Sequence, residues 1–295
     1  MGYCFSVPFL SFVRITNMDV FKPISKNLGF YNGRKKFYPT PDGFLRLAEI
    51  CVFSDPVYNP RRLESDGDPS RLAVDQSDKQ TEQHANIRSD YAITRARKRL
   101  YDLVACNPEC NMMATLTLNG EDFPRDDWNA VIKKLSTWLD NMTRRHDLKY
   151  ILVPEYHKDG KSIHFHGFVN EDSLNLVRAI NPKTGKPLLQ NGRAVYNIAN
   201  WKYGFTTAVR VGKSEVDQSS SAKYVLKYVT KGQEKIGGRY YLHGGDLKEP
   251  IVEYFNADFS EVGGDGWSEF AVTGNLSCKI CRDPMGGGGQ NGNTL

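Results

Sequence analysis

The feature that most constrains the fold is a regular alternation of strand and helix patterns in the middle of the chain. The stretch M-M-A-T-L-T-L (112–118) alternates apolar and threonine side chains, which is typical of a strand. Residues 126–145 then place apolar side chains at helical spacing. Three further strand patterns follow, at residues 149–157, 162–169 and 204–211.

A second, short helix is expected over E-D-S-L-N-L-V-R-A-I, residues 171–180. The predicted order β-α-β-β-α-β is that of the split βαβ unit. The sequence therefore predicts an α+β fold with a ferredoxin-like central antiparallel sheet and helices on one side. The apolar stripe of the longer helix consists of Trp128, Val131, Ile132, Leu135, Trp138, Leu139 and Met142.

Composition suggests how the rest of the chain is organised. Residues 1–86 form a predicted N-terminal extension, in which the polar, turn-rich segment 59–86 is interpreted as a linker or exposed loop. A helix is expected over 88–105. The main domain is placed at 87–260, and the Gly-rich residues 261–295 are interpreted as a disordered tail.

Basic residues are clustered rather than evenly spread in this chain, whose net charge is +5. Between residues 200 and 248 there are nine Lys or Arg against four Asp or Glu. Residues 88–99 contain five basic residues against Asp90 alone. Such clusters are typical of proteins that contact a phosphate backbone. Charge alone nevertheless fits an ordinary solvated basic face better.

The sequence also indicates a cellular compartment. No apolar run is long enough to span a bilayer, and the start of the chain lacks the basic region of a signal peptide. An intracellular, cytoplasmic protein is therefore expected. The six cysteines are too few for a disulfide scaffold at this length. C-N-P-E-C (106–110) and C-K-I-C (278–281) could supply zinc ligands, but their wide separation favours free thiols.

Two histidines and a carboxylate are brought together by a predicted hairpin. A two-residue Asp-Gly turn within K-D-G-K (158–161) places Glu155 directly opposite His164. Side chains alternate along strands, so His166 projects from the same face as this pair, and His157 lies at its end. Two imidazoles and one carboxylate suit Mn²⁺, Mg²⁺ or another divalent metal. The alternative is a pair of partly buried structural histidines.

The segment S-A-K-Y-V-L-K-Y-V-T-K-G (221–232) is a second unusual feature. On a helix, Tyr224, Lys227, Tyr228 and Lys231 share one outward stripe, opposite an apolar stripe. Exposed tyrosines among lysines can stack on nucleic acid bases or act as nucleophiles. The alternative is an ordinary solvated face.

Three of these stretches resemble, in order, the motifs of the HUH endonucleases. M-A-T-L-T-L resembles the first-strand motif, and I-H-F-H-G-F-V, preceded by P-E-Y-H-K-D-G, resembles the His-hydrophobe-His motif. Y-V-L-K-Y-V-T-K resembles the Tyr-x-x-Lys motif in its two-tyrosine form. The resemblance is to the rolling-circle replication initiators of single-stranded DNA phages and plasmids. It covers about residues 88–250 and leaves residues 1–86 and the C-terminal tail unassigned.

The resemblance implies roles for these residues. Tyr224 would attack the scissile phosphate to leave a 5′-phosphotyrosine and a free 3′-hydroxyl, and Tyr228 would serve the second cleavage or strand transfer. The alternative is that the two tyrosines exchange these roles, because the sequence does not order them. Lys227 would stabilise the phosphate or position the metal. Metal ligands would be His164, His166 and Glu155. Further DNA contacts are expected from Lys223, Lys231, Arg95, Arg97, Lys98 and Arg99.

The expected partners are single-stranded or supercoiled origin DNA together with a host helicase and polymerase. No phosphate-binding G-x-x-x-x-G-K-[ST] motif occurs, because Thr207 occupies the first glycine position before V-G-K-S. No nucleotide cofactor is therefore expected. Two alternatives stay open: a related transposase or relaxase, and a single-strand-binding module without enzymatic activity.

Overall fold

A computed structural model describes most of the chain, in two compact units that are treated separately below. The described residues are 22–23, 30–58, 82–211, 235–273 and 275–282. One unit is built around an eight-stranded sheet and contains the central part of the chain up to Glu249. The other is built around a six-stranded sheet from segments on either side of it.

The eight-stranded sheet contains the predicted split βαβ unit. Strands β5 and β4 flank β6, and β10 follows on the other side of β4. All these pairings are antiparallel. The α+β class and the central antiparallel sheet are thereby confirmed. The elements are β4 (Met112–Leu118), α2 (Trp128–His146), β5 (Tyr150–Tyr156), β6 (Ile163–Val169) and β10 (Gly204–Arg210).

Additional strands extend this sheet at both edges. β11 (Leu242–Gly244) pairs with β5, and β9 (Arg193–Ile198) pairs with β10. β9 also pairs with β7 (Leu176–Arg178) and β8 (Leu189–Gln190). The expected helix over 171–180 is therefore wrong.

That segment forms a single turn of 3₁₀ helix, Glu171–Ser173, followed by β7. The physical reason is that helix nucleation is unfavourable, and a segment this short adds too few helical hydrogen bonds to offset that free energy. Pairing with β9 satisfies the backbone of β7 instead, with Leu176 opposite Ile198.

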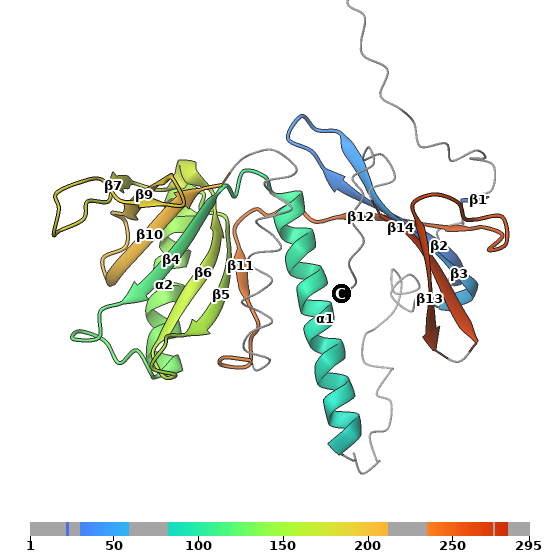
Figure 1. The fold of residues 1–295 in the computed structure, drawn as a ribbon, viewed down its shortest axis with the longest axis horizontal. Coiled ribbons are helices and arrows are strands. Elements are labelled where there is room, and N and C mark those ends of the chain that lie inside the picture. Colours follow the sequence, from blue (N-terminus) through green and yellow to red (C-terminus); the bar gives the residue numbers. More distant parts are fainter. Residues whose placement is uncertain (1–21, 24–29, 59–81, 212–234, 274, 283–295) are drawn as a thin grey trace, which may run out of the picture. The chain divides into compact units, whose positions relative to one another are not determined.

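Helix α2 covers one face of the sheet, behind β4 and β6 in Figure 1. Asp127 caps its start by accepting a hydrogen bond from the backbone N–H of Asn129 at 2.9 Å. Asp147 ends the helix in the left-handed conformation. The predicted stripe is confirmed as the core contact, with these buried members: Val131, Leu135, Trp138, Leu139 and Met142. They pack against inward side chains of β4 and β6 such as Leu116 and Phe165.

Helix α1 (Glu82–Cys106) covers part of the opposite face. Its buried Leu100, Leu103 and Val104 pack against Ile151 and Phe168 of the sheet. Only α2 thus matches the expectation of helices on one side. The helix also begins earlier than the expected 88–105, inside the segment interpreted as a linker. Among the described helices, none has the length and apolar character needed to cross a membrane.

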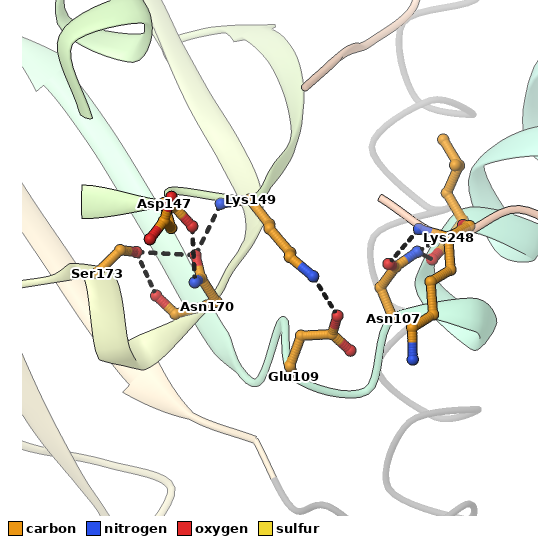
Figure 2. A network of polar contacts seen from close by, with 8 residues as sticks. Asn107, Glu109, Asp147, Lys149, Asn170, Ser173 and Lys248 are labelled. Carbon is orange, nitrogen blue, oxygen red and sulfur yellow. Dashed lines mark hydrogen bonds and ion pairs between the residues drawn. The ribbon is translucent and has the colours of Figure 1, made fainter. Parts of the chain in front are cut away.

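Two side-chain amides, of Asn107 and Asn170, tie the ends of these elements together, as Figure 2 shows. Asn107, only 1% exposed, donates from Nδ2 to the carbonyl of Lys248 at 2.9 Å and accepts at Oδ1 from the Lys248 N–H at 2.8 Å. Lys149 donates from its backbone to Asn170 Oδ1 and from Nζ to Glu109, both at 2.8 Å. These bonds fix the chain just after α1 and just before β5.

The six-stranded sheet corrects the predicted domain boundaries. Its order is β1-β12-β2-β3-β14-β13. β12 lies inside the expected main domain, and β13 and β14 lie inside the expected disordered tail. The predicted boundary between residues 260 and 261 and the interpretation of the tail as disordered are therefore wrong. Apolar side chains on these strands, such as Phe255 and Cys278, are buried in the unit. The bounds are β1 (Lys22–Pro23), β2 (Phe30–Pro39), β3 (Leu45–Tyr58), β12 (Ile251–Asn256), β13 (Trp267–Thr273) and β14 (Leu276–Arg282).

Candidate metal centre

The register predicted for the β5–β6 hairpin is confirmed. Glu155 pairs with His164, and Val153 pairs with His166. Because side chains alternate along a strand, Glu155, His164 and His166 lie on one face of the sheet. This is the face opposite α2, since the neighbouring Phe165 packs in the α2 core.

The turn of this hairpin differs from the two-residue Asp-Gly turn that was expected. The backbone N–H of His157 donates to the Ser162 carbonyl at 2.7 Å, so four residues lie between the last bonded pair. Asp159 accepts hydrogen bonds from the backbone N–H groups of Lys161 and Ser162, and Gly160 takes a positive φ of 69°. The register survives because a loop of four residues keeps the same residues opposite each other.

The three side chains converge on one point. Nε2 of His166 lies 3.1 Å from Glu155 Oε2, and Nε2 of His164 lies 3.4 Å from the same oxygen. One potential ligand atom from each residue lies within 4.8 Å of the others. Two ligands at about 2.1 Å from an ion and at right angles to each other lie about 3.0 Å apart. The spacing therefore fits three adjacent ligands of one divalent cation.

Thr115 on β4 orients one of the two imidazoles. It stands directly opposite His166, and its Oγ1 lies 2.9 Å from His166 Nδ1. If Nδ1 carries the proton and donates to this hydroxyl, the lone pair of Nε2 is directed toward Glu155. Sequence reasoning did not single out Thr115, because its contact with His166 depends on how β4 pairs with β6.

Burial adjusts the protonation of the other imidazole. His164 is 9% exposed, and this burial lowers its pKa below the ordinary histidine value. The hydrogen bond and charge of Glu155 act in the opposite direction and offset part of the shift. The neutral imidazole, which is the form that binds a metal, is therefore favoured.

His157 borders the site at the hairpin end, as expected. Its ring lies edge-on to the ring of His164, with centroids 5.5 Å apart. The side chain is exposed and belongs to the loop after β5. It is therefore placed to approach the open side of the site, and it is not a member of the converging triad.

The basic residues expected to bind DNA from α1 have different environments. Arg95 and Lys98 are exposed, whereas Arg97 and Arg99 are half-buried. Arg99 forms an ion pair with Glu249. Burial, and after it the charge of Arg99, lowers the pKa of the nearby His243. Arg99 thus has a partner within the unit.

The other expected site residues lie outside the described residues. These are Lys223, Tyr224, Lys227, Tyr228 and Lys231. Their roles stay predictions.

The two cysteine pairs belong to different units of the chain. Cys106 and Cys110 are buried in the larger unit, whereas Cys278 and Cys281 lie on β14 of the other sheet. Burial raises the pKa of Cys110 to about 12, which disfavours the thiolate that zinc requires. In the described part of the chain, the Glu155–His164–His166 group alone meets the geometric requirement for a metal.

Fold and site together define an α+β protein with a histidine–carboxylate group on the face of an antiparallel sheet opposite α2. Residues 111–233 match the sequence model of a family described as replication-associated protein ORF2/G2P. No curated protein and no solved structure matches the chain. The family match supports a role in the initiation of replication and is consistent with a rolling-circle initiator.

Proposed function

We propose that this protein is a site-specific, single-strand DNA endonuclease and strand transferase that initiates rolling-circle replication. The observation that carries the proposal is the convergence of Glu155, His164 and His166 inside the segment matched by a replication-associated family. Imidazole and carboxylate ligands together suit Mn²⁺ or Mg²⁺ that also binds a substrate oxygen. A bound cation would polarise the scissile phosphate and stabilise its developing negative charge.

The proposed nucleophile is the phenol of Tyr224. Its oxygen forms a bond to phosphorus while the bond from phosphorus to the 3′-oxygen breaks. The products are a 5′-phosphotyrosine and a 3′-hydroxyl, which takes up a proton as the phenol loses one. Lys227 stabilises the phosphate. Tyr228, one helical turn on, performs the second cleavage or the transfer that closes the circle.

The proposed substrate is the single-stranded or supercoiled origin of the replicon that encodes the protein, in the cytoplasm of a bacterial host. The free 3′-hydroxyl primes a host polymerase, and a host helicase unwinds the duplex. DNA contacts from Lys223, Lys231, Arg95, Arg97, Lys98 and Arg99 belong to the same proposal. So does the assignment of this chemistry to a domain extending from about residue 87.

The test is covalent capture. Labelled single strands that tile the DNA around the protein's own gene are incubated with protein and Mn²⁺, then run on a denaturing gel. We expect an adduct that withstands denaturation and disappears in Tyr224→Phe. Tyr156→Phe is the matched control, because this tyrosine is 47% exposed at the end of β5, next to Glu155 in sequence.

Each outcome separates the proposal from its rivals. Strand binding without any adduct, with or without metal, would refute the endonuclease and support a binding module. An adduct that persists in Tyr224→Phe would refute the assignment of Tyr224 as the nucleophile, and loss of the adduct in Tyr156→Phe would point to that tyrosine instead. Adducts on transposon-end hairpins and none on origin strands would identify a transposase. His164→Ala combined with His166→Ala should abolish the adduct, whereas His146→Ala, at the end of α2, should not.

A further inference from the structure

The face that carries the triad continues across the sheet to β10. Thr117 of β4 stands opposite His164 on one side and opposite Phe205 of β10 on the other. Glu155, His164, Thr117 and Phe205 therefore form one row across four adjacent strands. Neighbouring strands lie about 4.8 Å apart, so Phe205 is about 10 Å from His164 along this row.

The two ends of this face are covered differently. At one end, α1 covers Ile151 and Phe168. At the other, Phe205 is 73% exposed, and its neighbour on the same face of β10, Thr207, is also exposed. The intervening Thr206 and Ala208 are buried on the α2 side. From Phe205 to Ala208 the strand therefore alternates between exposed and buried side chains, and a phenylalanine occupies its exposed side. Farther along, Val209 is on the same face as Phe205 but is buried against Ala179 and Val195.

An exposed phenylalanine at this position has a chemical use. A single exposed apolar residue is common on proteins and requires no explanation by itself. Phe205 is distinguished by its row, because it shares that row with two of the three proposed metal ligands. A flat aromatic ring beside a site for a strand's phosphate is suited to receive an unpaired base.

We infer that Phe205 stacks on a base of the single strand held at the triad, and that this contact selects unpaired DNA over duplex. The inference rests on the proposed function. In a duplex both faces of each base are covered by neighbouring bases, so only an unpaired, unstacked base can meet the ring. Every base has a π-face, so Phe205 favours single strands without reading their sequence.

Binding of a fluorescein-labelled oligothymidylate, measured by anisotropy without metal, tests the stacking. Phe205→Ala is expected to weaken binding about 5- to 100-fold, as for removal of one stacked base. Phe205→Trp should bind at least as tightly as the wild type. Phe270→Ala, at an exposed strand position of the other sheet, is the matched control and should leave affinity unchanged. Duplex affinity should be the same in all four proteins.

The salt dependence of DNA binding distinguishes a stacking contact from a contact between basic residues and phosphates. Stacking releases no counterions, so the slope of log affinity against log salt should be unchanged in Phe205→Ala. A reduced slope would overturn the inference, since the substitution would then have displaced basic residues. Equal weakening by Phe205→Trp would overturn it too, because an aromatic ring able to stack on a base would still be present.

The position of the stacked base can be located after the nick has been mapped. An abasic site is placed at each nucleotide around the nick, and each strand is titrated with wild type and with Phe205→Ala. One position should weaken wild-type binding as much as the substitution does, with little further weakening when the two are combined. Full additivity at every position would refute stacking.

Failure of this inference is distinguishable from failure of the proposed function. A protein that forms the covalent adduct but binds oligothymidylate equally well with and without Phe205 refutes the stacking alone. A protein that neither forms an adduct nor binds single strands refutes both.

Discussion

The hydrogen bond between Thr115 and His166 links one ligand of the proposed metal centre to the neighbouring strand β4. Thr115→Val keeps the β-branched shape and the strand but removes the hydroxyl that lies 2.9 Å from Nδ1. The imidazole can then take the other tautomer, which places a proton on the Nε2 that lies 3.1 Å from Glu155. A proton on Nε2 prevents that nitrogen from binding a cation.

The magnitude follows from the hydrogen bond that the substitution removes. A neutral hydrogen bond contributes about 0.5–1.5 kcal/mol net, which corresponds to about 2- to 13-fold in affinity. Removal of a group that orients a metal ligand typically costs about 10- to 100-fold. We therefore expect Thr115→Val to weaken Mn²⁺ binding about tenfold in isothermal titration calorimetry.

Two further variants make this prediction refutable. Thr115→Ser restores a hydroxyl and should recover most of the affinity. Thr117→Val alters the other threonine that β4 contributes to this face. Thr117 stands opposite His164, and no bond from its hydroxyl to a histidine is present among the described residues. It should change Mn²⁺ affinity little. Equal weakening in Thr117→Val, or unchanged affinity in Thr115→Val, would show that the hydroxyl does not orient the ligand.

Three other predictions concern stability. Gly167→Ala should lower the free energy of unfolding in urea by about 2–4 kcal/mol, because its Cβ would lie 1.9 Å from the Ile151 carbonyl oxygen. Asn107→Ala should cost about 1–3 kcal/mol in the same assay by leaving the buried bonds to Lys248 unmade. The folded state lowers the pKa of His164, so the unfolded chain takes up protons first as the pH falls. Without metal, the free energy of unfolding should decrease as the pH falls below about 6.5, the ordinary histidine pKa. His164→Gln should make this pH dependence shallower. A steeper pH dependence in the variant would show that folding does not lower the pKa of His164.

The local parts of this structure were predictable because short-range periodicity determines them. The apolar stripe of α2 and its acidic start follow from helical spacing within one segment. The pairing of Glu155 with His164 was predictable for a similar reason. A hairpin fixes which residues face each other once the centre of its loop is known. Loops of two and of four residues centred on Asp159 and Gly160 give the same register.

The errors arose where pairing between distant segments overrides local pattern. The segment expected to be a short helix became β7 because β9 offers it backbone partners. β14 pairs with β3, more than two hundred residues earlier in the chain, so the glycine-rich composition around it was a poor guide. Neither partner is visible from the segment itself.

By itself, the sequence determined the hairpin that brings Glu155 and His164 together, since that geometry depends on a few adjacent residues and the two-residue period of a strand. The tertiary structure decided what surrounds them. The pairing of β4 with β6 places Thr115 against His166, and the pairing of β4 with β10 places Phe205 in the same row. The register between strands that are not joined by a hairpin is set by packing of the whole sheet on α2. No local pattern in the chain encodes it.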